Sequence, residues 1–117
     1  MVKYDKQLGT TFAALADPTR RAILARLERE DGASISELAR PLAIKLPAVM
    51  KHLDVLDHAG LVTRSKVGRT VTVRLSAAPM QAAVAWLNRY ERFWSSSLDR
   101  LTAYAERKEA ETRRKTP

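Results

Sequence analysis

The chain has 117 residues, no cysteine and a formal net charge of +8. The length fits one domain, and the missing thiols exclude disulfides, thiolate metal sites and a cysteine nucleophile. Residues 1–10 contain no apolar stretch, and the longest apolar run, about six residues from Ala82 to Leu87, is far below the roughly 20 residues of a membrane span. We therefore expect a cytoplasmic protein with no signal peptide and no membrane partner.

The positive charge is concentrated in one third of the chain. Residues 1–39 have six basic and six acidic side chains, whereas residues 40–75 have seven basic and two acidic ones, a net charge of +5. Such a cluster is typical of a surface that binds nucleic acid. An ordinary solvated basic surface explains the charge alone equally well, so the local pattern has to decide.

The first part of the chain predicts two helices. Leu8, Phe12 and Leu15 follow the i, i+4, i+7 spacing of one apolar helix face. Asp17-Pro18 predicts the start of a second helix, because Asp is a good N-cap and Pro is tolerated at the first helical position. Asp31-Gly32 ends this helix.

Two short helices with a tight turn between them follow, which is the layout of a helix-turn-helix. Ser34 and Glu37 have the S-x-x-E spacing of a capping box, and Pro41 limits this third helix to about two turns. Pro47 lies in the first turn of a fourth helix, and Gly60 ends it. The apolar stripe of the fourth helix consists of Val49, Leu53 and Leu56.

The rest of the chain predicts a hairpin and one long helix. Leu61–Lys66 and Thr70–Leu75 alternate or favour β-branched residues around Gly68-Arg69, as in a β-hairpin. Pro79 starts a last helix that runs to about Arg107, and the charged segment behind it predicts a disordered tail. The expected fold is mostly α-helical with about five helices and a small β-hairpin, a winged helix-turn-helix. It occupies residues 1–107, and the tail occupies residues 108–117.

The fourth helix has a second face that suits the major groove of DNA. Ala48, Lys51, His52 and Val55 share this face and are small, basic or able to form hydrogen bonds. An ordinary solvated helix face is the alternative, but the basic hairpin that follows favours DNA, since Arg at its tip suits the minor groove. The candidate DNA contacts are Lys45, Leu46, Ala48, Lys51, His52, Lys66 and Arg69.

Several segments between residues 8 and 75 occur in the order and spacing of a known family. They are Phe12–Leu24, Ile35–Ala39, Leu46–Leu53, Leu56, Ala59–Val62 and Gly68-Arg69. In these segments the chain resembles the winged-helix regulators of the ArsR/SmtB type. The resemblance implies operator binding as a homodimer, usually in repression, with an inducer that releases the DNA; the sequence does not identify an inducer.

Three positions at and before the predicted fourth helix depart from the family pattern. Ala43 stands where Gly is usual, which predicts strain if the turn requires a left-handed backbone. Lys45 stands where Ser is usual at the helix start, so a good N-cap is missing. Met50 replaces a usual Ser and removes a polar contact to DNA.

Metal sensing, which many family members show, has little support in these residues. There is no cysteine, and the predicted final helix contains no histidine. Only Asp54 and His58, at i and i+4, could share a metal, and an exposed ion pair is the commoner role of such a pair. The chain therefore resembles the metal-independent members. We expect no metal, no cofactor, no catalytic residues and no enzymatic activity.

The predicted final helix carries apolar residues almost to its end. Leu87, Trp94 and Leu101 recur every seven residues, and so large an exposed apolar surface is disfavoured in a monomer. Since two-fold dimers are the commonest oligomers, we expect a homodimer held by the first and last helices. The expected interface residues are Leu8, Phe12, Leu87, Trp94, Leu98 and Leu101.

These features together predict a regulator of transcription, a repressor, that binds a palindromic operator as a homodimer. Two other classes stay open. A DNA-architectural module without sequence preference is disfavoured by the apolar and histidine content of the reading face. A winged helix used only for protein contacts is disfavoured by the charge of +5 on residues 40–75.

Overall fold

The computed structural model describes the backbone of residues 3–115 and the side chains of residues 6–95 and 99–113. The chain divides into two compact units, of which the first ends at Val84 and the second begins at Ala85. The boundary lies within a helix. Among the described helices, none is both long and apolar enough to cross a membrane.

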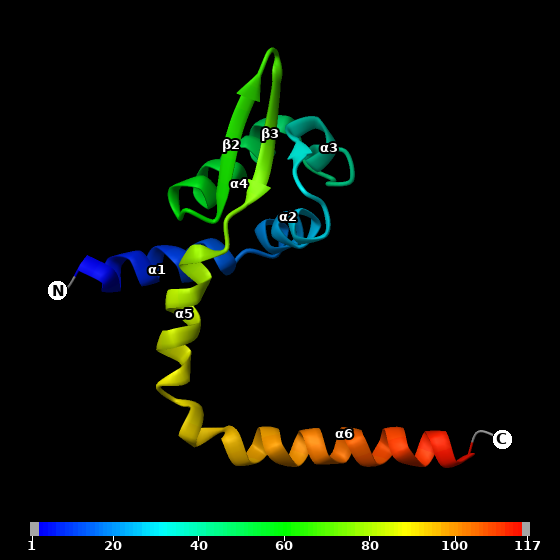
Figure 1. Ribbon diagram of the computed structural model, residues 1–117. Helices are drawn as coiled ribbons and strands as arrows, with labels where there is room; N and C mark the ends of the chain where they lie inside the picture. The colour runs from blue at the N-terminus through cyan, green and yellow to red at the C-terminus, as the bar shows by residue number, and fades with distance from the viewer. Residues whose placement is uncertain (1–2, 116–117) are drawn as a thin grey trace. The chain divides into compact units, whose positions relative to one another are not determined.

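Four helices form most of the first unit (Figure 1). They are α1 (Lys3–Leu15), α2 (Pro18–Arg29), α3 (Ile35–Ala39) and α4 (Leu46–His58). The predicted start of α2 is confirmed, since the Asp17 side chain accepts a hydrogen bond from the backbone N–H of Arg20. The predicted capping box is confirmed as well, with reciprocal bonds between Ser34 and Glu37.

A three-stranded antiparallel sheet completes the winged helix-turn-helix. Its strands are β1 (Ala33–Ser34), β2 (Val62–Val67) and β3 (Thr70–Leu75), in the order β1-β3-β2. The hairpin turns between Val67 and Thr70, which pair with each other, and Gly68 has a φ of 63° that favours glycine. The sequence predicted this hairpin but not β1, whose two residues pair with Val73 and Thr72.

The core of the first unit joins the helices to the sheet. The apolar stripe of α4 is fully buried, as predicted, with Val49, Leu53 and Leu56 each 0% exposed. The other main contributors are Ile23 and Leu27 of α2, Leu38 of α3, Leu61 and Val62 at the start of β2, and Val73 of β3. The inner face of α4 is therefore fully packed, which holds the helix at a fixed place on the core.

Two turns around α4 have different backbone requirements. Gly60, directly after α4, has a φ of 76°, as expected of a glycine that ends a helix. No described residue other than glycine has a positive φ, so Ala43 is not in the left-handed region. The predicted strain at Ala43 is therefore wrong, because the segment between α3 and α4 turns without the conformation that would require Gly.

The second unit corrects the prediction of one continuous final helix. The helix α5 (Ala78–Asn88), whose last part belongs to this unit, is followed by a 3₁₀ turn, η1 (Glu91–Phe93), and by α6 (Ser95–Lys115). Around the break, i→i+3 bonds such as Tyr90 N–H to Leu87 O (3.0 Å) replace the α-helical ones. Ser95 is the first residue of α6, and serine is favoured at helix starts over helix interiors, so its position fits the start of a new helix.

The helix α6 also continues beyond the predicted end at Arg107. It extends to Lys115, and an Arg113–Glu109 ion pair at i, i+4 supports its last turns. The predicted disorder from residue 108 is therefore wrong for residues 108–115. Residues 116 and 117, the end of the predicted tail, lie outside the described residues.

Candidate nucleic-acid interface

The side of α4 away from the core carries an exposed basic residue. Lys51 is exposed, and Val55 on the same side is 39% exposed, whereas Ala48 and His52 are partly buried. The start of the helix is open as well: Lys45 is the N-cap residue, makes no side-chain cap bond, and is followed by Leu46 at 54% exposure. The missing cap predicted from Lys45 is thus confirmed, and the backbone N–H groups of the first turn have no side-chain partner there.

The hairpin presents the second predicted basic group. Lys66 and Arg69 are exposed on either side of the turn, and Val67 between them is 78% exposed. Figure 1 shows the β2–β3 hairpin extending beyond the helices of the first unit. Its tip therefore projects away from the core as a wing.

A hollow connects the start of α4 to the wing. It has a volume of about 360 Å³ and is lined by Leu46 and Met50 of α4, by the wing residues Arg69, Thr70 and Val71, and by Ser34–Ser36 at the start of α3. Two predicted contacts, Leu46 and Arg69, thus line the same concave surface. Met50, the departure from the family pattern, forms part of its wall in place of a small polar side chain.

One arginine ties α4 to the wing, and no sequence signal had pointed to it. Arg64 on β2 donates from Nε and Nη2 to Oδ2 of Asp57, at 3.0 and 2.6 Å, and from Nη1 to Oδ1 of Asp54, at 3.0 Å. The hydrogen bond with Asp57 is the main cause that raises the pKa of Arg64. Both acidic residues of α4 are therefore bound to Arg64, and Asp54 is engaged with Arg64 instead of the predicted alternative partner His58.

A second arginine contacts α4 from the other direction. Arg20 on α2 places Nη1 3.3 Å from Nδ1 of His52, and its other nitrogens donate to Ala14 O (Nε, 2.8 Å) and Ala13 O (Nη2, 2.9 Å). The Asp17 carboxylate lies 3.9 Å from His52 Nδ1. The backbone N–H of Arg20 is the main cause that lowers the pKa of Asp17. The Nδ1 atom of His52 thus faces Arg20 and Asp17 within the protein, and the sequence did not predict this contact.

The predicted dimer residues lie on several elements. Leu8 and Phe12 on α1 are partly buried. Leu87 (40% exposed) is on α5, Trp94 follows η1, and Leu101 (63% exposed) is on α6, so the sevenfold recurrence does not run along one helix. Leu98 is on α6, but its side chain is outside the described residues.

Aromatic rings gather at the break between α5 and α6. Trp86 and Tyr90 meet edge to face at 5.2 Å between ring centroids, Tyr90 and Phe93 are 6.4 Å apart, and the Arg92 guanidinium lies 4.8 Å above Phe93. Tyr90 and Phe93 remain exposed. These rings support the break in the helix and leave apolar surface uncovered.

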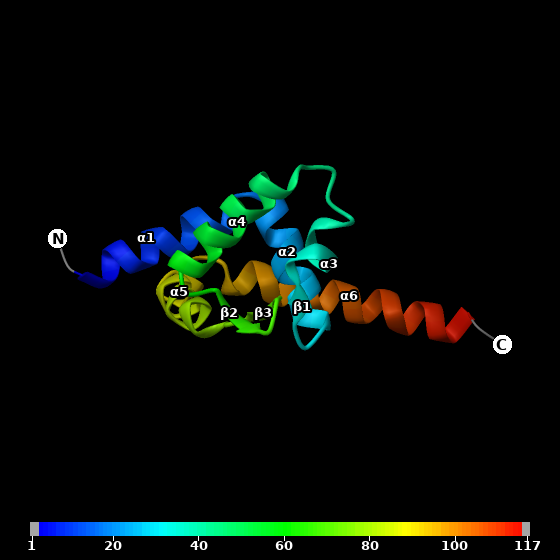
Figure 2. The same ribbon diagram turned by 90° about the horizontal axis from the view of Figure 1, so that it is seen from above.

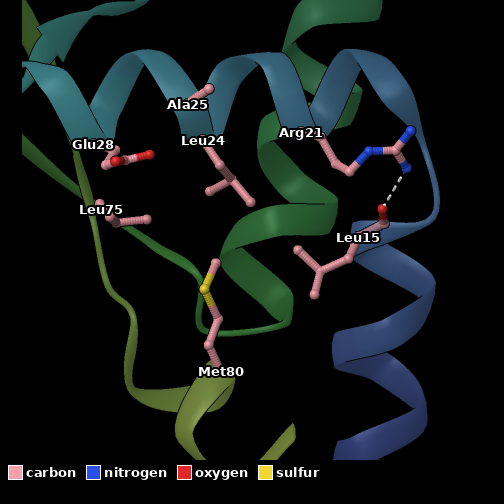
Figure 3. Close-up of a pocket in the computed structure, with 7 residues that line it drawn as sticks. All are labelled: Leu15, Arg21, Leu24, Ala25, Glu28, Leu75 and Met80. Carbon is pink, nitrogen blue, oxygen red and sulfur yellow. Dashed lines mark hydrogen bonds between the residues drawn. The ribbon is translucent and has the colours of Figure 1, made fainter. Parts of the chain in front are cut away.

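A separate apolar pocket of about 330 Å³ lies in the first unit. Figure 3 shows the side chains of Leu15, Leu24 and Met80 converging on it, with Leu75 closing one side and Ala25 above. Arg21 and Glu28 stand at its two ends, and Arg21 donates to Leu15 O at 2.8 Å. None of the candidate DNA contacts lines this pocket, so it is distinct from the surface formed by α4 and the wing.

Comparison with known proteins assigns the family. A helix-turn-helix domain model matches residues 15–65. The HTH-type transcriptional regulator Rv2034 of Mycobacterium tuberculosis is 40% identical over 95 residues, which cover 81% of this chain and 82% of that protein. The crystal structure of the ArsR family transcriptional regulator RHA00566 superposes with a TM-score of 0.73 and 44% identity, covering 82% of this chain and 98% of that one. The chain belongs to the ArsR/SmtB family of winged helix-turn-helix transcription regulators.

Another relative of this chain has a name that specifies repression. The HTH-type transcriptional repressor SmtB of Mycobacterium tuberculosis is 41% identical over 68 residues, covering 58% of this chain and 50% of that protein. As an ArsR/SmtB regulator, the chain uses α3 and α4 as its helix-turn-helix and the β2–β3 hairpin as its wing. Figure 2, seen from above, shows α1, α2 and α4 grouped together in the first unit, with α3 beside α2.

Proposed function

We propose that this ArsR/SmtB regulator represses transcription by inserting α4 into the major groove of a specific operator, with the wing on the adjacent backbone and minor groove. One observation carries the proposal. Lys45, Lys51, Lys66 and Arg69 are all exposed, and none of them forms an ion pair with a described side chain. Unpaired cations on the exposed side of α4 and at the tip of the hairpin complement the negative charge of DNA phosphates.

The candidate contacts have different tasks. Lys45, Lys66 and Arg69 supply charge to phosphates and, at the wing tip, to the minor groove, where Arg gains from the negative potential. On α4, Ala48 is small enough to meet a thymine methyl group, and Lys51 can bond to guanine O6 or N7. Leu46 and His52 complete the set, Leu46 through apolar contact and His52 through its second ring nitrogen.

The working unit in this proposal is a homodimer. Exposed apolar residues of the second unit, such as Leu87, Phe93, Leu101 and Tyr104, form more apolar surface than a monomer usually leaves in water. A second copy of the same surface is the simplest cover, and two copies would present two recognition helices to half-sites about one helical turn of DNA apart. The operator is then an imperfect palindrome.

The proposal includes no catalytic step, cofactor or metal, and it places the protein in the cytoplasm with its DNA. Asp54, the one carboxylate that the sequence offered as a partner for a metal-binding His58, is bound to Arg64. Operator binding is therefore expected to be the same with and without a chelator. The identity of an inducing ligand stays open.

Selection of binding sites from random duplexes tests the proposal. We expect an enriched, two-fold symmetric motif, and a shift of labelled DNA that depends on sequence. Lys51→Ala should change the base preferred at one position of each half-site, whereas Arg29→Ala, which removes an equal charge from α2 outside the interface, should leave the motif unchanged. No enrichment, with equal shifts for every sequence, would leave the architectural module as the better description.

A further inference from the structure

The guanidinium of Arg20, on α2, contacts both the end of α1 and the helix α4. Its Nε and Nη2 atoms donate to the carbonyl oxygens of Ala14 and Ala13, at 2.8 and 2.9 Å. Both carbonyls are in the last turn of α1, where carbonyl groups have no partner within the helix and a positive charge is favourable. Its Nη1 atom lies 3.3 Å from Nδ1 of His52 on α4. The side chain therefore spans from the end of α1 to the recognition helix.

The chemistry of arginine decides which atom of the His52 ring has the proton. A guanidinium has only donors, and it stays charged at all ordinary pH values. A contact of 3.3 Å between Arg20 Nη1 and His52 Nδ1 is therefore a hydrogen bond only if Nδ1 is the acceptor. The ring is then neutral, and its proton is on Nε2.

The neighbouring carboxylate does not offer a better arrangement. Asp17 Oδ2 is 3.9 Å from His52 Nδ1, too far for a hydrogen bond, and the same oxygen accepts the backbone N–H of Arg20 at 3.0 Å. A proton on Nδ1 would face the Arg20 guanidinium and gain only this distant attraction. The contacts within the cluster thus agree on one tautomer.

We propose that Arg20 is a positioning residue of the DNA interface, which fixes α4 relative to the end of α1 and holds His52 as the Nε2–H tautomer. A displacement of α1 is then transmitted directly to the recognition helix, because Arg20 bonds to both. The side chain of His52 is 22% exposed, so part of the ring is open to a ligand. The proposal has a second consequence, which rests on the proposed function. Toward DNA, His52 can act only as a hydrogen-bond donor.

This restriction selects among bases. In the major groove a donor at Nε2 can meet N7 of a purine, O6 of guanine or O4 of thymine, but not the amino groups of cytosine or adenine. His52 thus favours acceptors on the base edge or phosphate oxygens. Arg20 determines this preference without touching DNA.

Nitrogen-15 NMR of the full-length protein tests the tautomer without DNA. The chain has two histidines, and His58, exposed on the same helix, is the internal reference. In mildly alkaline solution we expect a single Nε2–H tautomer for His52. Arg20→Lys should shift the His52 ring resonances, because an ammonium cannot reach three diverging acceptors, whereas Arg21→Lys on the same helix should not. A proton on Nδ1 in the wild type, or unchanged resonances in Arg20→Lys, would overturn the proposal.

Two substitutions of His52 separate its ring nitrogens. The amide oxygen of Asn can replace Nδ1 as the acceptor for Arg20, whereas the longer Gln places its polar end near Nε2. We expect Arg20→Lys to weaken DNA binding about tenfold in the wild-type and His52→Asn backgrounds, and to have no further effect in His52→Gln. Equal effects of Arg20→Lys in the Asn and Gln backgrounds would contradict the coupling. If no operator is found, the NMR result still decides the tautomer, so the two proposals fail separately.

Discussion

Arg64→Met tests whether the wing is fastened to the recognition helix by charge. The substitution removes three donor contacts to Asp54 and Asp57, the shortest at 2.6 Å, and keeps an apolar stem of similar length. The Arg64 side chain is 26% exposed, but the carboxylates of Asp54 and Asp57 are 65% and 42% exposed. Solvent therefore screens the bond to Asp54 to well below 1 kcal/mol, and the two donors on Asp57 contribute about 1–2 kcal/mol.

These contributions predict a loss of about 1–2 kcal/mol in the free energy of unfolding. For a domain of this size, 1 kcal/mol corresponds to about 4–8 °C in Tm, so the shift is readily measured by thermal denaturation. Arg74→Met is the matched control, because Arg74 lies on the neighbouring strand β3 and is 3.9 Å from a fully exposed Asp31. We expect the control to change stability by no more than about 0.5 kcal/mol.

The same variant should weaken DNA binding beyond its effect on stability. Without Arg64, the carboxylates of Asp54 and Asp57 on α4 lose their counter-charge and repel phosphates. Binding to any duplex should fall, and the difference from the wild type should shrink in high salt. Equal losses of stability in Arg64→Met and Arg74→Met would refute the argument that geometry and partial burial make the Arg64 contacts special.

Three further predictions concern the wing, the dimer and acid stability. Arg69→Ala should weaken binding to all sequences and lower the slope of log affinity against log salt by about one, because it removes one cationic contact. Leu101→Asp should convert the dimer into a species of 13.1 kDa with much weaker operator binding, which analytical ultracentrifugation and gel shifts would show; an unchanged dimer mass would exclude Leu101 from the interface. The pKa of Asp17 is lowered in the folded state, so its stabilising effect is present above its ordinary value of 3.8 and is lost as the pH falls through the lower folded value. In urea titrations Asp17→Asn should therefore be less stable than the wild type at neutral pH and approach the wild type in acid. A difference in stability that is the same at every pH would contradict this role of the Asp17 carboxylate.

Local signals explain why most of the first unit could be predicted from sequence. Asp17-Pro18, the Ser34/Glu37 pair and Gly60 act within one helical turn of their own position, and the structure uses each of them as predicted. The buried stripe of α4 follows from its 3.6-residue period. The two-residue strand β1 has no such signal, since it exists only through pairing with β3.

The final helix shows where periodicity misleads. Pro79 and the apolar residues that continue almost to the end of the chain predicted one helix to about Arg107, along which Leu87, Trp94 and Leu101 recur every seven residues. In the structure the helix breaks between Asn88 and Ser95. There, 3₁₀ hydrogen bonds pair the backbone groups and aromatic rings pack against one another. A period of seven describes the residues that are apolar, but not whether they belong to the same helix.

The charge pattern that first indicated DNA binding has a different meaning at different residues. Among the seven basic residues between positions 40 and 75, Arg64 has a structural role, because it forms ion pairs with both acidic residues of that segment. Because Asp54 and Asp57 are already paired, they no longer offset Lys51 on the same helix. Arg20 lies outside the basic segment, on α2, and contacts α4 through His52. The helix α4, which starts without a side-chain cap, is thus fixed by two arginines whose partners belong to the protein itself. Lys45, Lys51, Lys66 and Arg69, which are exposed and have no described ion pair, are the basic residues that the proposal assigns to phosphates.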